Sequence, residues 1–350
     1  MIRRVAVVGA GVMGSEIAQA VASGGVDVVL FDADPTALER GIAHVSDIGR
    51  RRIARGRITE AEAAEILGRV TPSAEDAALG ACDLAIEAVP EILDIKRTVF
   101  RRLDAALPAG ALIASNTSGL SISDLAAETA RPERVLGLHF FNPASVMKLV
   151  EVIGGSGTDA ATLAAGAAFV RDLGKTPVSV RECPGFLVNR ILLRAMAEAY
   201  RQAAETGADP AAADRAVVEA GPAPMGPFAL GDLIGLDTLE HIRADLERAY
   251  GDRFQDGGTT GRLVTAGRLG AKSGGGFFDG APPEAGADDA GRAVAEKYYS
   301  GAIDEARRCV DEDVAAPEDV DIAMRLGCGW SDGPLTWARA DRPVAPLGGR

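Results

Sequence analysis

A glycine-rich turn near the amino end constrains the fold of this chain more than any other feature of its sequence. The string Gly9-Ala10-Gly11-Val12-Met13-Gly14 fits G-x-G-x-x-G; it follows the apolar run Val5–Val8 and precedes an amphipathic stretch. Between a strand and a helix, the first glycine allows a tight turn, the second lets the backbone approach a pyrophosphate, and the third lets the helix pack against the strand. The sequence therefore predicts a dinucleotide-binding βαβ unit of the Rossmann type.

Asp32 indicates which dinucleotide the turn binds. It follows the second apolar run, Val26–Phe31, where a carboxylate can accept hydrogen bonds from both hydroxyls of a ribose. The same charge repels a 2′-phosphate, and the next residues supply no arginine to compensate, so NAD is favoured over NADP. The phosphates would lie at the backbone amides of Val12 and Met13, where the helix begins. In the competing interpretation, the turn belongs to another kind of α/β protein and Asp32 caps a helix.

Short apolar runs alternate with helical stretches up to about residue 183. Such runs are typical of strands buried on both faces, and their alternation predicts parallel βαβ units. Pro184-Gly185 then interrupts the pattern, and no further strand-like alternation follows. We therefore expect an α/β protein with an NAD-binding Rossmann domain over residues 1–183 and an all-helical C-terminal domain over residues 184–280. The runs are Val5–Val8, Val26–Phe31, Leu84–Ala88, Ala111–Ala114, Val135–Phe140, Leu149–Ile153 and Val178–Val180.

The C-terminal part contains a weak internal repeat. Asp214 precedes Gly226-Pro227 at the same spacing at which Asp321 precedes Gly333-Pro334. A repeat of this kind usually means duplicated packing units. Residues 281–350 are therefore expected to form a linker and a truncated second helical repeat.

The charge balance and the cysteines restrict the class of protein. There are 50 acidic and 37 basic residues, a formal charge of -13, which argues against a partner that is a nucleic acid. The four cysteines are scattered and form no C-x-x-C pair, so they are expected to be reduced thiols rather than a disulfide framework or a metal site. No run approaches the roughly 20 apolar residues that a membrane helix needs. We expect a cytoplasmic protein that does not bind membranes.

His139 and Glu151 form the candidate catalytic pair. His139 stands near the end of the run Val135–Phe140, Glu151 lies in the run Leu149–Ile153, and the segment between them is turn-like. If the two runs pair as an antiparallel hairpin, the two side chains lie opposite one another, about 5 Å apart at Cβ. The imidazole could then act as the base that an alcohol oxidation needs, oriented by the carboxylate. Alternatively, His139 is a strand-end histidine satisfied by a neighbour.

Two further polar positions are candidates for the same site. Ser115-Asn116-Thr117-Ser118 follows a predicted strand, and ligands bind at the carboxyl ends of parallel strands. These side chains could hold the nicotinamide carboxamide and a substrate oxygen, or they could belong to a helix start. Asn189 lies near the start of the helix after Pro184-Gly185. It could donate to a developing alkoxide, or be a buried amide satisfied by the backbone.

Several ordered strings resemble the L-3-hydroxyacyl-CoA dehydrogenase family, and particularly its 3-hydroxybutyryl-CoA dehydrogenases, from about residue 3 to residue 279. The family's fold is a Rossmann-type domain followed by a helical domain that carries the contact of a homodimer. The strings are Ser115-Asn116-Thr117-Ser118, His139-Phe140-Phe141-Asn142-Pro143, Met147-Lys148-Leu149-Val150-Glu151-Val152, Cys183-Pro184-Gly185-Phe186-Leu187-Val188-Asn189-Arg190, Pro224-Met225-Gly226-Pro227-Phe228 and Lys272-Ser273-Gly274-Gly275-Gly276-Phe277.

The resemblance implies a role for each matching residue. His139 corresponds to the catalytic base and Glu151 to its acidic partner, while Ser118 and Asn189 correspond to residues that contact substrate and nicotinamide. The cofactor set then comprises Gly9, Gly11, Val12, Met13, Gly14, Asp32, Glu91, Lys96, Asn116 and Ser118, with Glu91 and Lys96 near the nicotinamide and its ribose. The family binds CoA partly along the helical insertion after the second strand, so the arginines at 50–57, represented by Arg52, are candidate phosphate contacts.

The function that follows is the NAD-dependent oxidation of an L-3-hydroxyacyl-CoA to the 3-oxoacyl-CoA. A short acyl chain such as 3-hydroxybutyryl is expected, as in fatty acid β-oxidation. One alternative keeps the chemistry but replaces the CoA ester by a free hydroxy acid such as gulonate, or by carnitine. An alternative of another class is a dimer that binds NAD without turnover. The presence of His139, Glu151, Ser118 and Asn189 together argues against that last interpretation, because a pure binding protein needs none of them.

Overall fold

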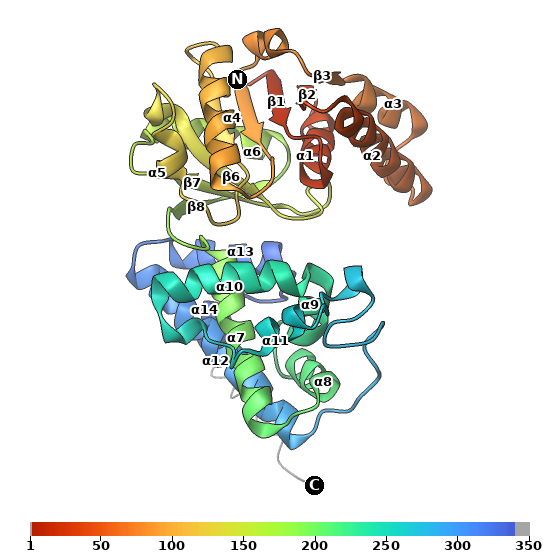
Figure 1. Ribbon diagram of the computed structural model, residues 1–350, viewed down its shortest axis with the longest axis vertical. Helices are drawn as coiled ribbons and strands as arrows, with labels where there is room; N and C mark the ends of the chain where they lie inside the picture. Colours follow the sequence, from red (N-terminus) through yellow and green to blue (C-terminus); the bar gives the residue numbers. More distant parts are fainter. Residues whose placement is uncertain (1, 340–350) are drawn as a thin grey trace. The chain divides into compact units, whose positions relative to one another are not determined.

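In the computed structural model, which describes residues 2–339, the apolar runs of the first half of the chain become strands of one sheet (Figure 1). This sheet belongs to the first of two compact units, Met1–Glu182 and Cys183–Arg350. Its strand order is β3-β2-β1-β4-β5-β6-β7-β8. The strands are β1 (Arg4–Val8), β2 (Asp27–Phe31), β3 (Val70–Ser73), β4 (Leu84–Glu87), β5 (Leu112–Ser115), β6 (Val135–Phe140), β7 (Leu149–Gly154) and β8 (Thr176–Arg181).

Neighbouring strands are parallel except for the pair β6–β7, which is antiparallel. Val5, Val7 and Ile86 in the central strands are fully buried, as expected for a sheet covered on both faces. The predicted α/β class and Rossmann-type domain are thus confirmed. The edge strand β3 was not predicted from the sequence.

The connections in the first unit are mostly helices whose starts the sequence specifies. Asp34 accepts a hydrogen bond from the amide of Thr36 and precedes Pro35, so α2 begins there. Thr59 and Glu62 form a reciprocal capping box at the start of α3. Figure 1 shows α2 and α3 side by side at one end of this unit. The helices are α1 (Val12–Ser23), α2 (Pro35–Ala54), α3 (Glu60–Gly68), α4 (Leu93–Ala106), α5 (Ile122–Ala126) and α6 (Ala160–Asp172).

The described residues of the second unit form helices and, apart from one isolated β-bridge, no strands. Gly207, in the left-handed conformation, ends α7, and Asp209 with Pro210 begins α8. The most extensive packing between two helices in the described part of this unit joins α7 to α12. Its helices are α7 (Val188–Thr206), α8 (Pro210–Ala220), α9 (Pro227–Ile234), α10 (Leu236–Tyr250), α11 (Thr259–Thr265), α12 (Asp289–Asp311), α13 (Pro317–Cys328) and α14 (Pro334–Arg339). The end of the predicted second repeat, residues 340–350, lies outside the described residues.

The internal repeat has a structural counterpart. The carboxylate of Asp214 accepts hydrogen bonds from the amides of Phe228 and Ala229 at the start of α9, at 2.9 and 2.8 Å. The carboxylate of Asp321 does the same for Leu335 and Thr336 at the start of α14, at 2.8 and 2.9 Å. In each copy a β-carbon on the preceding glycine, Gly226 or Gly333, would lie 2.2 Å from the aspartate, which explains why a glycine is needed there. The predicted partial second helical repeat is therefore confirmed over the described residues.

No helix among residues 2–339 is long and apolar enough to cross a membrane.

Candidate active site

The glycine turn adopts the conformation that its sequence predicts. Gly9 has φ +103°, and a β-carbon there would lie 2.7 Å from the carbonyl oxygen of Ala88. A β-carbon on Gly14 would overlap the carbonyl oxygen of Gly9. Gly11, in contrast, has no heavy atom within 4 Å of the place where its β-carbon would be. The fold thus requires Gly9 and Gly14, whereas at Gly11 there is open space for a ligand to approach the backbone, as the dinucleotide motif requires.

Asp32 lies at the end of β2 and faces this turn. Its Oδ2 accepts a hydrogen bond from the amide of Ala10 at 2.8 Å, and its Oδ1 accepts one from the amide of Asp34 at 3.0 Å. The carboxylate therefore lies at the carboxyl edge of the sheet beside the glycine turn, where a ribose would be held. The residues present fit an NAD molecule at this edge.

The candidate pair of His139 and Glu151 lies as the sequence predicts. His139 and Glu151 are directly opposite in the β6–β7 register, and His139 Nδ1 lies 2.6 Å from Glu151 Oε2. Both residues are buried, Glu151 completely. The ring of Phe141 lies 4.6 Å from the imidazole between centroids and limits its rotation. With the Nδ1 proton donated to Glu151, a neutral imidazole carries its lone pair on Nε2, which is the arrangement a general base requires.

A buried ion pair between Lys96 and Glu87, extended by the exposed Glu91, lies at the ends of β4 and β5. Lys96, only 1% exposed, places Nζ 2.7 Å from Glu87 Oε1 and 3.0 Å from Glu91 Oε2. The other oxygen of Glu87 accepts a hydrogen bond from Ser115 Oγ at 2.6 Å, and Glu91 Oε1 accepts one from the amide of Ser118 at 2.9 Å. The network therefore fixes the backbone of Ser118. Sequence reasoning named Glu91, Lys96 and Ser118 but missed Glu87, whose only signal is an acid at the end of a buried run.

Asn116 directly follows β5 and is hydrogen-bonded to the end of β6. Its side-chain oxygen accepts a hydrogen bond from the amide of Phe140 at 2.8 Å, next to His139. The amide nitrogen is thus the part of Asn116 that could meet a nicotinamide carboxamide. Asn189 is in the second unit, on the first turn of α7, and is half-buried. The first unit alone brings together the glycine turn, Asp32, the Ser118 region and the His139–Glu151 pair.

Two side chains that sequence reasoning missed fasten the loop between β6 and β7. Glu16, a buried residue of α1, accepts a hydrogen bond from the amide of Ser145 at 3.0 Å. Lys175 Nζ donates to the carbonyl oxygens of Ala144 and Met147, both at 2.6 Å. The helix that starts at the glycine turn is therefore bonded to the loop that follows His139. The only sign of this contact in the sequence is an acidic residue on the inward face of α1.

Lys175 gives this loop a pH-dependent contribution to stability. Burial first, and then the charge of Lys148, lower the pKa of the Lys175 amine from 10.5 to about 8, although Glu16 opposes the shift. Between these pH values the unfolded chain binds more protons than the folded chain. The contribution of Lys175 to the free energy of unfolding therefore rises with pH through this window and is lost as the pH falls through 8.

We expect the free energy of unfolding to increase more between about pH 7.5 and pH 9.5 in the parent chain than in Lys175→Arg, whose guanidinium stays charged in both states. Urea unfolding of both proteins at the two pH values measures this difference. The other titratable groups are the same in both proteins, so their contributions cancel when the two pH-dependent changes are subtracted. Equal pH dependence in the two proteins would show that Lys175 titrates alike folded and unfolded.

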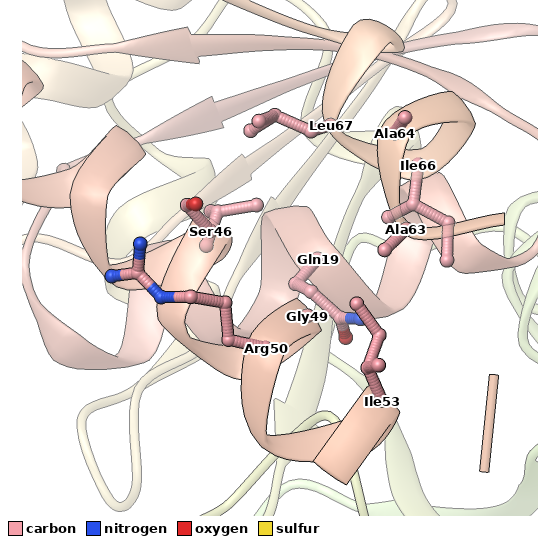
Figure 2. Close-up of a pocket in the computed structure, with 10 residues that line it drawn as sticks. Gln19, Ser46, Gly49, Arg50, Ile53, Ala63, Ala64, Ile66 and Leu67 are labelled. Carbon is pink, nitrogen blue, oxygen red and sulfur yellow. The ribbon is translucent and has the colours of Figure 1, made fainter. Parts of the chain in front are cut away.

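The predicted arginine cluster lies at the carboxyl end of α2. Arg52 is half-buried and donates from Nη1 to Ser23 Oγ at 3.1 Å, whereas Arg51 and Arg55 are exposed. Beside the cluster is a hollow of about 150 Å³ between α1, α2 and α3 (Figure 2). Its wall is mostly apolar, with the Arg50 side chain and the Gln19 amide among the polar groups. The lining residues are Gln19, Val45, Ser46, Gly49, Arg50, Ile53, Ala63, Ala64, Ile66 and Leu67.

Family models match most of the chain. The model described as "3-hydroxyacyl-CoA dehydrogenase, NAD binding domain" matches residues 4–183. The model described as "3-hydroxyacyl-CoA dehydrogenase, C-terminal domain" matches residues 185–280 and 294–340, so it recurs over the region of the internal repeat.

Individual relatives agree with the family models. The chain is 40% identical over 279 residues to a "Probable 3-hydroxybutyryl-CoA dehydrogenase" of Bacillus subtilis, which covers 79% of this chain and 97% of that protein. It is 40% identical over 280 residues to a "3-hydroxyadipyl-CoA dehydrogenase" of Escherichia coli, where the match covers 79% of this chain but only 59% of that protein. A crystal structure of 3-hydroxybutyryl-CoA dehydrogenase from Escherichia coli superposes with a TM-score of 0.90 at 31% identity, covering 97% of this chain and 92% of that one.

Proposed function

This chain belongs to the 3-hydroxyacyl-CoA dehydrogenase family, and from that premise we propose that it oxidises short L-3-hydroxyacyl-CoA esters with His139 as the general base. The family makes it an NAD-dependent oxidoreductase. The observation that carries the catalytic assignment is the buried hydrogen bond between His139 Nδ1 and Glu151 Oε2, at the same edge of the sheet as the glycine turn.

The first unit would hold NAD through three sets of groups. The amides at Gly11, Val12 and Met13 meet the pyrophosphate, Asp32 meets the adenosine ribose, and Glu91 and Asn116 meet the nicotinamide half. Bound NAD supplies the hydride acceptor, so that the substrate loses two electrons and two hydrogens and becomes the 3-oxoacyl-CoA. Lys96 is buried against Glu87 and Glu91, and we assign it an indirect role: it holds Glu91 in place.

The protein groups act on the hydroxyl proton and on the developing charge. Nε2 of His139 accepts the proton from the substrate hydroxyl, and Glu151 stabilises the imidazolium that results. The hydroxyl of Ser118 and the amide of Asn189 would donate hydrogen bonds to the substrate oxygen. The hydrogen bond from the backbone amide of Ser118 to Glu91 fixes the backbone that carries the Ser118 hydroxyl, so that less reorganisation is needed during the reaction.

A substrate survey with NAD tests the proposed function. We expect NADH formation with L-3-hydroxybutyryl-CoA and L-3-hydroxyhexanoyl-CoA. The kcat/KM for L-3-hydroxyadipyl-CoA measures whether the enzyme accepts a terminal carboxylate on the acyl chain. Free 3-hydroxybutyrate, gulonate and carnitine should give at least 10²-fold lower kcat/KM, because they lack the binding energy of the CoA portion. Turnover confined to the free acids would remove CoA from the proposal.

Arg52 provides a matched variant for the CoA half of the same survey. Arg52→Ala should raise the KM for the CoA ester but not for the N-acetylcysteamine thioester, which carries the acyl group without phosphates. Arg40, which is exposed on the same helix but lies outside the cluster at 50–57, is the control for a general loss of positive charge. Equal effects of Arg52→Ala on both thioesters would contradict a phosphate contact.

We also propose that the protein acts as a cytoplasmic homodimer in fatty acid β-oxidation. All four cysteines are free thiols, which supports a reducing compartment. The second unit exposes apolar side chains around α9, namely Met225, Leu233 and Ile234, and such groups often lie in contacts between proteins. The names of the relatives support a thioester pathway.

A further inference from the structure

The turn that leads into α7 is strained. Gly185 has φ +74°, and Phe186, which is not a glycine, has φ +51°. A side-chain-bearing residue in this left-handed region is costly and persists only where its surroundings fix it, often at functional sites. The Phe186 side chain is buried, and its amide donates to the carbonyl oxygen of Cys183 at 3.0 Å. Asn189, the proposed donor to the substrate oxygen, lies directly after this turn.

Arg190 holds this turn in place through contacts of its backbone and its side chain. It is completely buried, and its backbone amide donates to the carbonyl oxygen of Gly185 at 3.2 Å. Its guanidinium lies 3.9 Å from Cys183 Sγ and stacks over the ring of Tyr250 at 4.3 Å. The hydroxyl of Tyr250 in turn donates to the carbonyl oxygen of Pro184 at 3.2 Å. Arg190 and its stacking partner therefore contact three consecutive residues of the strained turn.

The charge of Arg190 is balanced by residues that lie far beyond it in the sequence. Glu305 of α12 is completely buried, and its Oε1 accepts from Arg190 Nε at 2.6 Å and from Arg253 Nη2 at 3.1 Å. Glu312, just after the same helix, places Oε2 2.8 Å from Arg190 Nη2. A buried guanidinium without such partners would be strongly destabilising. Both carboxylates come from the part of the chain after residue 280, where the second repeat lies.

We propose that the second repeat acts in cis on a substrate-contacting residue: Glu305 is a positioning residue that holds Arg190, and through it the strained turn, so that Asn189 is held in one conformation at the start of α7. The proposal rests on the function proposed above, because it takes Asn189 to contact the substrate. It gives residues 281–339 a role in turnover beyond packing. Glu305 itself touches no reacting atom.

Glu305→Gln is the first test. It keeps the shape of the side chain and removes its charge, so that Arg190 loses its closest counter-ion. We expect kcat for L-3-hydroxybutyryl-CoA to fall on the order of 10- to 100-fold, as for a catalytic group displaced by about 1 Å. The Kd for NADH, measured by fluorescence, should stay unchanged, because the dinucleotide groups lie in the first unit. Glu296→Gln, an exposed position on α12, is the matched control and should leave kcat unaltered.

A double variant separates positioning from stability. Arg190→Met with Glu305→Leu replaces the completely buried ion pair by apolar groups of similar volume, which is often neutral or stabilising. The partners left behind, Arg253 and Glu312, are 22% and 42% exposed, so that water can solvate their charges. We expect the Tm of the double variant to be at or above the parent value while kcat stays low, because the guanidinium of Arg190 no longer contacts Cys183 or the ring of Tyr250. If kcat recovers together with Tm, the pair is only structural and the proposal is wrong.

The same series distinguishes this proposal from the proposed function. An inactive parent chain on every CoA ester would contradict the function. An active parent chain with an equally active Glu305→Gln variant would contradict only the role of the second repeat.

Discussion

Replacing His139 with asparagine is expected to lower kcat for L-3-hydroxybutyryl-CoA by about 10²- to 10⁴-fold, the usual contribution of a general base. An asparagine side chain places its nitrogen where Nδ1 of the imidazole lies, so it can still donate to Glu151. It offers no basic nitrogen at the position of Nε2, so the hydroxyl proton has no acceptor on the protein. The Kd for NADH should change little, because the groups proposed to bind the dinucleotide remain. Steady-state kinetics and NADH titration measure the two effects separately.

The choice of asparagine guards against a trivial explanation. Glu151 is completely buried, and His139→Ala would remove a hydrogen bond from it at a cost of about 1–3 kcal/mol. A loss of activity in that variant could then reflect unfolding. His241 serves as the control histidine, since its side chain is 67% exposed and belongs to the second unit. Parent-like turnover in His139→Asn would mean that another group takes the proton.

The sequence predicts the sheet well because buried parallel strands leave a clear signal. The run Val5–Val8 carries an apolar residue at every position, and Val135–Phe140 is interrupted only by Gly137 and His139, a pattern typical of a strand covered on both faces. The edge strand β3 lacks this signal. Its four residues, Val70–Ser73, include a proline and only one buried side chain, so pairing with β2 rather than local preference makes it a strand.

The contacts of the candidate site likewise fall into those that the sequence predicts and those that it does not. His139 and Glu151 could be paired from the sequence because the alternation of side chains along a strand fixes which residues of a hairpin face each other. Glu16 and Ser145 could not be paired, since they are far apart in the sequence and meet only after the sheet and α1 pack together. The same holds for Arg190 and Glu305, which come from different repeats. Local periodicity predicts contacts within an element or a hairpin, whereas buried ion pairs between distant elements depend on tertiary packing.

Glu151→Gln is expected to reduce kcat by about 10²- to 10⁴-fold, although Glu151 touches no substrate atom. The amide is nearly the same size as the carboxylate but carries no charge to stabilise the imidazolium that forms when His139 takes a proton. If the nitrogen of the new amide faces Nδ1 of His139, it donates a hydrogen bond to that atom. The neutral imidazole then carries its proton on Nε2 and its lone pair on Nδ1, which is the wrong nitrogen for a base. In the hydrolase triad the equivalent substitution costs about 10⁴-fold. Turnover near that of the parent chain would mean that Glu151 only fills space in the sheet.

A double-mutant cycle tests whether the two residues work as one unit. If Glu151 acts only through the imidazole, it has nothing to orient once His139 is asparagine. The double variant His139→Asn/Glu151→Gln should therefore turn over no more slowly than His139→Asn alone, and the two losses should be far from additive. Additive losses would give Glu151 a separate function, such as shaping the strand pair or the substrate pocket. Because the 2.6 Å contact of Glu151 is with Nδ1, we expect non-additivity: the carboxylate matters to the reaction only as long as an imidazole stands opposite it.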